Sequence, residues 1–141
     1  MMKLSQKEKE NAVNECRILA SIDHPNVVSY KEAFFDDPTS SLIIVMEFAA
    51  GGDLLGKVEK HQARRTSFSE KELWSYLIQC LKGLEALHKI KICHRDLKCA
   101  NLFLTQEGVI KLGDLNVSKV QKRGLMYTQT GTPYYASPEV W

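Results

Sequence analysis

The stretch that decides the fold is His94-Arg95-Asp96-Leu97-Lys98-Cys99-Ala100-Asn101, and Asp114 follows it thirteen positions after Asn101. Short apolar segments around Leu102–Leu104 and Val109–Leu112 lie between Asn101 and Asp114, separated by a glycine-containing sequence that is typical of a turn. We expect the two segments to pair as a hairpin. The hairpin would bring Asn101 and Asp114 back to the same end of the pair.

The residue types in this stretch suit the transfer of a phosphoryl group. Such a transfer needs positioning and compensation of negative charge more than covalent chemistry from the protein. Asp96 can accept or orient the proton of an attacking hydroxyl, and Lys98 offers a cation for the transferring phosphate. Asn101 and Asp114 offer the oxygen ligands that Mg²⁺ prefers beside phosphate oxygens. A single Asp or Lys is usually a solvated surface charge, so the prediction depends on the conjunction of these residues.

The composition is that of an ordinary globular domain, with 44% hydrophobic and 26% charged residues among 141. The net charge of +2 is too small to indicate binding to nucleic acid or to a membrane surface. The charged stretch Met1–Glu10 is no signal peptide, and the longest apolar run, Leu42–Met46, is too short to span a bilayer. The cysteines lack metal-binding spacing, so we expect reduced thiols in a cytosolic protein: Cys16, Cys80, Cys93 and Cys99.

The first part of the chain predicts one helix followed by two strands. Ser5 and Glu8 form a capping-box pattern, which favours a helix over Ser5–Ala20. Apolar and β-branched runs predict strands over Val27–Phe35 and Leu42–Phe48.

The middle of the chain predicts two further helices. Gly51-Gly52-Asp53 marks a linker, and a short helix is expected to follow through about His61. The strongest pattern is a helix over Glu70–His88, which opens with a capping box at Ser69. Its predicted buried face consists of leucines at helical spacing: Leu73, Leu77, Leu81, Leu84 and Leu87. From Gly113 onward we expect a long loop, and long ordered loops are usually functional.

These motifs together resemble eukaryotic protein kinases and, within them, the NIMA-related serine/threonine kinases. The similarity covers essentially the whole chain and rests on five segments: His94–Asn101, Lys111–Asp114, Gly131–Glu139, Asn14–Leu19 and His24–Val28. The last two resemble the αC helix of the family and the turn that follows it.

The resemblance implies a role for each matching residue. Asp96 corresponds to the catalytic base, with Arg95 beside it, and Lys98 marks the serine/threonine class. Asn101 and Asp114 correspond to the metal ligands. The other implied nucleotide contacts are a gatekeeper, two hinge residues, a ribose contact and the αC glutamate that pairs with the ATP-binding lysine: Met46, Glu47, Ala49, Asp53 and Glu15.

The segment from Asp114 to Glu139 resembles the activation segment of the family. Thr128 matches the family's phosphorylation position, and Thr130 is the near alternative. A phosphothreonine there could pair with Arg95 and Lys119 through charge-assisted hydrogen bonds. A further threonine of this segment, Thr132, resembles the residue that hydrogen-bonds near the catalytic base.

The chain departs from the family pattern in two ways. The usual Asp-Phe-Gly is Asp114-Leu115-Asn116, where Leu115 can still pack toward Leu19 and His94. Asn116 replaces a glycine, and asparagine tolerates left-handed backbone well. The second departure is that the chain shows no Gly-rich phosphate loop and no ATP-binding lysine ahead of Ser5.

The sequence therefore predicts an α+β, protein-kinase-like two-lobe fold in truncated form, with a partial N-lobe sheet, the αC helix and a partial helical C-lobe. Residues 1–48 would be the N-lobe remnant, 49–53 the hinge and 54–141 the C-lobe portion through the activation segment. The implied function is transfer of the γ-phosphoryl group of ATP, with Mg²⁺, to Ser or Thr of protein substrates, without nucleic acid or membrane.

Two alternatives remain open. One is a non-catalytic fragment that binds a protein partner, and the other is oxidant sensing by Cys93 and Cys99 beside Asp96. The expected location is the cytoplasm, and cytoskeletal or ciliary association follows from the family resemblance alone.

Overall fold

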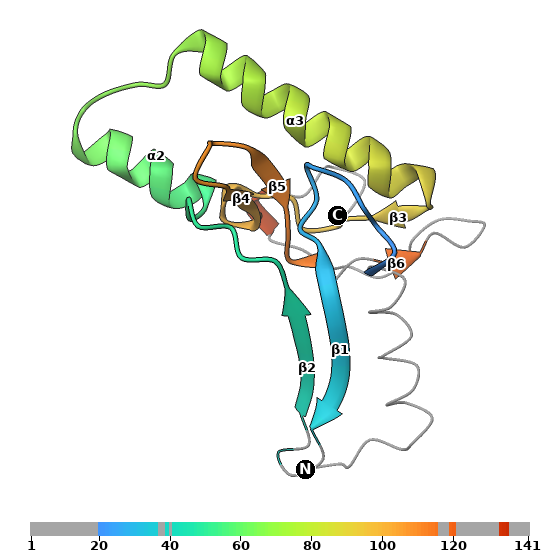
Figure 1. Ribbon diagram of the computed structural model, residues 1–141. Coiled ribbons are helices and arrows are strands. Elements are labelled where there is room, and N and C mark those ends of the chain that lie inside the picture. The colour runs from blue at the N-terminus through green and yellow to red at the C-terminus, as the bar shows by residue number, and fades with distance from the viewer. Residues whose placement is uncertain (1–19, 37–38, 40, 116–118, 121–132, 136–141) are drawn as a thin grey trace.

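The computed structural model describes residues 20–36, 39, 41–115, 119–120 and 133–135. Their elements are β1 (Tyr30–Asp36), β2 (Ser41–Met46), α2 (Leu54–Ala63), α3 (Glu70–Lys89), β3 (Ile92–Cys93), the 3-10 helix η1 (Cys99–Asn101), β4 (Leu102–Leu104), β5 (Ile110–Leu112), β6 (Lys119–Val120) and the 3-10 helix η3 (Pro133–Tyr135). The long helix α3 runs beside the β4–β5 pair, and the β1–β2 hairpin projects away from both helices (Figure 1). Helices combined with small antiparallel sheets confirm the predicted α+β class. The helix predicted over Ser5–Ala20 lies outside the described residues, apart from Ala20.

The first two strands form an antiparallel hairpin with register pairs such as Phe34 with Ile43. The prediction that the first strand begins at Val27 was wrong, because β1 begins at Tyr30. Val27 instead makes an isolated parallel bridge to Leu112, and the backbone N–H of Val28 donates to Leu112 O at 2.8 Å. The segment before β1 is therefore bound to β5 rather than to β2.

The predicted hairpin after Asn101 is confirmed. β4 pairs antiparallel with β5, and Leu102 lies opposite Leu112. In the turn, the N–H of Gly108 donates to Thr105 O at 3.1 Å, and Gly108 has a φ of +81° that suits glycine.

Helix α3 begins where the sequence predicts, because the Ser69 hydroxyl oxygen accepts a hydrogen bond from Glu72 N at 3.3 Å. The predicted buried face was wrong in part. Leu73, Leu77 and Leu81 are 51%, 47% and 56% exposed, whereas the buried residues of α3 are Tyr76, Gly83 and Leu87.

The tight approach of α3 to its neighbours at Gly83 helps to explain which face of the helix is buried. A Cβ at Gly83 would lie 2.6 Å from Asn26 O and 2.8 Å from Leu112 Cδ1, so only glycine fits there. Beside it, Gln79 Oε1 accepts hydrogen bonds from Ile110 N at 2.8 Å and from Asn26 Nδ2 at 3.3 Å. A count of apolar side chains cannot register either contact, because glycine has no side chain and glutamine is polar.

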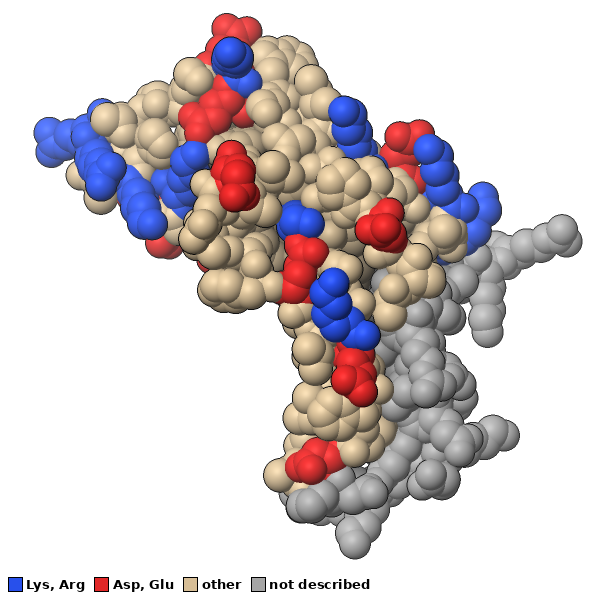
Figure 2. Space-filling model, in the orientation of Figure 1, with Lys and Arg blue, Asp and Glu red and all other residues tan. Residues whose placement is uncertain are grey.

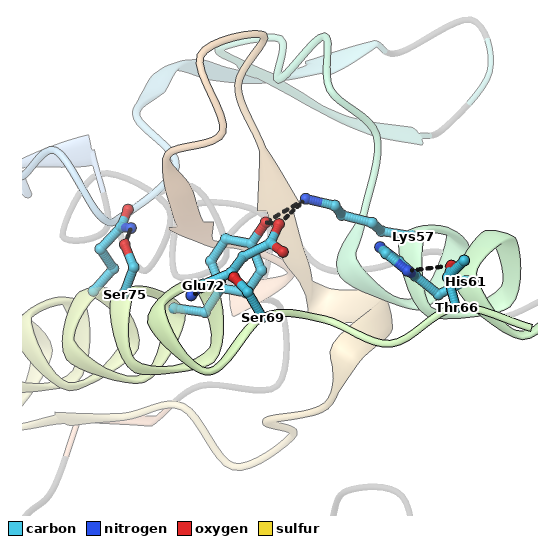
Figure 3. A network of polar contacts seen from close by, with 8 residues as sticks. Lys57, His61, Thr66, Ser69, Glu72 and Ser75 are labelled. Atoms are coloured by element: carbon cyan, nitrogen blue, oxygen red, sulfur yellow. Dashed lines mark hydrogen bonds and ion pairs between the residues drawn. The ribbon is translucent and has the colours of Figure 1, made fainter.

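Helix α2 is joined to α3 by a polar network (Figure 3). Asp53 caps α2, and its Oδ1 accepts from Gly56 N at 2.8 Å. Lys57 Nζ binds both Glu72 and the Tyr76 hydroxyl, and this pairing raises the pKa of Lys57 and lowers the pKa of Glu72. The predicted helix end at about His61 is two residues short of the observed end.

The core lies between α3 and the β4–β5 hairpin. Its members are Ile22, Val27, Tyr30, Tyr76, Leu87, Ile92, Leu102, Leu104, Ile110, Leu112 and Leu115. The sequence prediction of a continuous loop after Gly113 was wrong at β6, which pairs antiparallel with β3. The thiols Cys80, Cys93 and Cys99 are free and half-buried.

Charges of both signs are spread over the face shown in Figure 2, and Lys and Arg side chains gather over the end of α2. That end carries Lys60, Arg64 and Arg65. In the part of the chain that the structure describes, none of the helices has the length and hydropathy that a membrane span requires.

Candidate active site

The hairpin register determines where the candidate site lies. Leu102 pairs with Leu112, so the residues just before β4 and just after β5 meet at one end of the hairpin. The N–H of Gly113 donates to Asn101 O at 3.0 Å, which holds these two ends together. The segment 94–101 leads into the same end through η1. The fold thus brings the Asp96 segment and the segment that carries Asp114 to one place.

Asp96 lies within a small network of side chains from its own loop. Lys98 Nζ is 2.9 Å from Asp96 Oδ2, and Asn101 Nδ2 donates to the same oxygen at 3.1 Å. The side chains of Asp96 and Lys98 are 12% and 25% exposed. Charged groups with so little solvent contact are held by their partners, so the Asp96 carboxylate has a defined orientation.

The amide of Asn101 is oriented by two acceptors on one residue. Its Nδ2 donates to Asp96 O at 2.8 Å as well as to the carboxylate of Asp96. An amide nitrogen carries two hydrogens, so this pair of bonds assigns the nitrogen and leaves Oδ1 as the atom that could bind a metal.

The oxygen atoms of these side chains suit Mg²⁺. The described residues hold no group of three or more His, Cys, Asp or Glu side chains that could bind a metal ion. Mg²⁺ usually takes one or two protein oxygens and completes its shell with water and phosphate oxygens. Asn101 Oδ1 and the half-buried Asp114 carboxylate supply oxygens of this kind.

His94 links the Asp96 loop to the segment after β5. The ring is 2% exposed, and Nε2 lies 3.0 Å from Gly113 O, while the N–H of Asp96 donates to Nδ1 at 3.4 Å. A carbonyl oxygen only accepts, so Nε2 carries the proton and the ring is neutral. Burial lowers the pKa of His94 below its ordinary value, which agrees with this assignment.

Two residues of the site have left-handed backbone. Arg95 has a φ of +68° and Asp114 a φ of +54°. Non-glycine residues in this region are uncommon, and such strain collects at functional sites. The sequence analysis placed left-handed tolerance at Asn116, which lies outside the described residues.

The predicted hinge residues follow β2. Met46 ends the strand and is 42% exposed, and Ala49 is half-buried. The N–H of Glu47 donates to Ser29 O at 2.8 Å. The Asp53 side chain caps α2. The family resemblance implies a ribose contact for Asp53 and does not predict this structural role.

Several predicted residues lie outside the described part of the chain: Glu15, Thr128, Thr130 and Thr132. Lys119 is described only through its backbone, in β6. Leu115 is 1% exposed and belongs to the core, and its expected neighbour Leu19 lies outside the described residues.

The sequence analysis missed one contact at the site. Lys111 Nζ in β5 lies 2.6 Å from Glu47 Oε1 in the hinge. Both residues appear in the motifs, but a single sequence gives no signal that pairs opposite charges so far apart along the chain.

The chain is similar in sequence to a known protein family and to several known proteins. The protein kinase domain family matches residues 1–141. The chain is 42% identical to the probable serine/threonine-protein kinase nek2 of Dictyostelium discoideum over 96% of the chain and 34% of that relative. It is 39% identical to the serine/threonine-protein kinase Nek5 of Mus musculus over 95% of the chain and 21% of that relative.

It is also 37% identical to the serine/threonine-protein kinase Nek1 of Mus musculus over 98% of the chain and 11% of that relative. The chain therefore spans about a third or less of the length of these relatives. The resemblance that the His94–Asn101 stretch predicts is confirmed, and the chain belongs to the protein kinase domain family.

Proposed function

We propose that the natural protein carrying this chain transfers the γ-phosphoryl group of ATP to Ser or Thr hydroxyls of protein substrates. The observation that carries the proposal is the Asp96 carboxylate, held by Lys98 and Asn101 at the end of the hairpin that leads to Asp114. A loop that served only to connect two elements would not require a nearly buried carboxylate beside a lysine and an oriented amide.

Each group has a defined task in this proposal. Asp96 orients the substrate hydroxyl and accepts its proton as the oxygen attacks the γ-phosphorus, while the bond from that phosphorus to the β–γ bridging oxygen breaks and ADP leaves. Lys98 compensates the charge on the transferring phosphate, and it remains within reach of the Asp96 carboxylate. Asn101 Oδ1 and Asp114 hold Mg²⁺, which when bound compensates the negative charge of the phosphates.

The remaining assignments follow the family resemblance. Met46 is the gatekeeper, and the backbone of Glu47 and Ala49 receives adenine. Asp53 contacts ribose through Oδ2, since Oδ1 already caps α2. Glu15 pairs with the ATP-binding lysine.

Regulation of the site is also proposed from the resemblance. Phosphorylation of Thr128, or of Thr130, orders the activation segment through Arg95 and Lys119. Thr132 supports the Asp96 loop. The proposal divides the chain into residues 1–48 of the N-lobe, 49–53 of the hinge and 54–141 of the C-lobe, in a protein of the cytoplasm.

A second function applies to the 141 residues as a separate polypeptide. These residues include neither a Gly-rich loop nor a lysine matching the ATP-binding one. One side of α3 exposes apolar side chains to solvent: Leu73, Trp74, Leu77, Ile78 and Leu81. Contiguous apolar surface of this kind suits a protein partner, so a non-catalytic binding fragment is the alternative.

Asp96→Asn in the natural full-length protein tests the first function. We expect kcat to fall by roughly 10²–10⁴, the usual contribution of a general base, while ATP affinity stays nearly unchanged because Asp96 does not hold the nucleotide. Glu107→Gln is the matched control, since Glu107 is an exposed carboxylate at the opposite end of the hairpin. Near-normal turnover of Asp96→Asn would remove Asp96 from its role.

Mg²⁺-dependent ATP binding by the 141-residue polypeptide separates the two functions. Calorimetry with and without Mg²⁺ is the measurement, and the full-length protein is the reference. If only the full-length protein binds ATP, the result supports catalysis by the full-length protein and a non-catalytic role for the 141-residue polypeptide. If the isolated polypeptide also binds ATP tightly, the result contradicts the binding-fragment alternative.

A further inference from the structure

The ion pair between Glu47 and Lys111 connects the two halves of the proposed nucleotide site. Lys111 Nζ lies 2.6 Å from Glu47 Oε1, and the two side chains are only 16% and 24% exposed. Lysine and glutamate are rarely so buried unless they are paired, and a pair with little solvent contact is screened much less than a surface pair. The Lys89–Glu85 pair on α3 offers the contrast, because its side chains are 70% and 62% exposed.

The positions of Glu47 and Lys111 show which parts of the proposed site the ion pair joins. Glu47 directly follows β2 and opens the hinge, which the proposed function assigns to adenine. Lys111 is the central residue of β5, three positions before Asp114, and Phe103 of β4 lies opposite it. The pair is thus a side-chain link between the adenine-binding segment and the hairpin that ends in the metal ligands.

Backbone hydrogen bonds also hold both ends of the segment from Glu47 to Gly52. The N–H of Gly51 donates to Leu104 O at 2.7 Å, and the N–H of Leu104 donates to Gly52 O at 2.8 Å. At the other end, the N–H of Glu47 donates to Ser29 O at 2.8 Å. The hinge is therefore bound to the hairpin by backbone at 51–52 and by the Lys111 side chain at Glu47.

We propose that Lys111, acting through Glu47, is a positioning residue that fixes the hinge relative to the metal-binding hairpin. This inference rests on the proposed function, because ATP must contact the hinge and the metal ligands at once. A small error in their relative position misplaces the γ-phosphate, and such errors are costly in rate and binding.

Lys111→Met in the natural full-length protein removes the charge and keeps most of the apolar stem. We expect KM for ATP to rise roughly fivefold or more, with a smaller change in kcat, because ground-state positioning of the nucleotide is what is lost. Lys111→Arg keeps a cation within reach of Glu47 and should restore most of the affinity. Lys89→Met, which breaks the exposed pair on α3, is the matched control and should leave KM unchanged.

Amide hydrogen exchange tests the same link without relying on activity. The Glu47 and Gly51 amides should exchange faster in Lys111→Met than in the wild type, and should be unchanged in Lys89→Met. Should Lys111→Met fail to fold, Glu47→Gln, which removes the same charge pair with little change in shape, is measured in its place.

Hydrogen exchange and the KM for ATP together distinguish a failure of the positioning role of Lys111 from a failure of the proposed kinase function. Faster exchange together with a raised KM supports both the positioning role and the kinase function. Faster exchange in Lys111→Met, together with a wild-type protein that shows no kinase activity, supports the link and rejects the proposed function. Unchanged exchange at Glu47 and Gly51, or an unchanged KM in an active enzyme, overturns the inference.

Discussion

The buried ring of His94 makes one side chain of the site sensitive to pH. Its Nδ1 accepts from the backbone of Asp96 and its Nε2 donates to Gly113, so the folded protein needs the neutral ring. Burial is the largest cause of its lowered pKa, and it outweighs the opposite effects of the Gly113 carbonyl and of Asp96 and Asp114. Protonation would replace the accepting Nδ1 with a donor that faces an N–H group.

We therefore expect the free energy of unfolding to fall as the pH drops below 6.5, the ordinary value for histidine. In that range the unfolded chain binds a proton that folded His94 does not, so stability increases with pH. Denaturant unfolding between pH 7.5 and 5.0 is the measurement. His94→Gln keeps hydrogen-bonding groups and cannot titrate, so its slope should be flatter. Equal slopes in the two proteins would contradict the assignment of a neutral buried ring.

Helix α3 shows how an element can end in strained backbone. Lys91 follows the last turn with a φ of +62°, and its N–H donates to His88 O at 2.9 Å. Glycine is the usual residue there because it has no Cβ to clash. Lys91→Gly should therefore stabilise the protein by about 0.5–1 kcal/mol, measured as the free energy of unfolding.

Lys82→Gly provides the control for this prediction, because the same substitution then falls at an exposed position in the interior of α3. There, glycine should destabilise by about 1 kcal/mol through the loss of helix propensity. Opposite signs at the two positions would show that the φ of residue 91 matters. A destabilising Lys91→Gly would mean that its lysine side chain contributes more than the backbone strain removes.

The elements differ in how far their sequence predicts them. The start of α3 at Ser69 and the β4–β5 hairpin depend on residues close in sequence, so both were predicted. The buried face of α3 was not, because the helix packs tightly at Gly83, against Asn26. The β3–β6 pair was missed because each strand has two residues and carries no periodicity of its own.

The candidate site follows the same rule. Asp96, Lys98 and Asn101 lie within one short loop, and their spacing was enough to predict that they lie together. The Glu47–Lys111 pair joins distant segments and became evident only from the fold. The proximity of residues within one loop was therefore predictable, and the contact between the hinge and the hairpin was not.

Across the molecule as a whole, apolar side chains are divided between a core and an exposed strip. Leu87 is fully buried in the core, whereas Leu77 and Leu81 on the same helix are 47% and 56% exposed. The β1–β2 hairpin adds further exposed apolar groups, with Phe34 and Val45 at 43% and 41%. Apolar surface over α3 and the hairpin favours association between molecules.

We expect the double substitution Leu77→Lys and Leu81→Lys to lower self-association of the isolated 141-residue polypeptide, measured by sedimentation velocity over a range of concentrations. Stability should change by no more than about 0.5 kcal/mol for each site, because exposed positions contribute little and lysine favours helix. Leu87→Ala is the opposite case. It should lower the free energy of unfolding by about 2–5 kcal/mol because it leaves a cavity, and it should leave the exposed apolar strip unchanged. Self-association that persists in the double variant would show that another surface, such as the β1–β2 hairpin, mediates it.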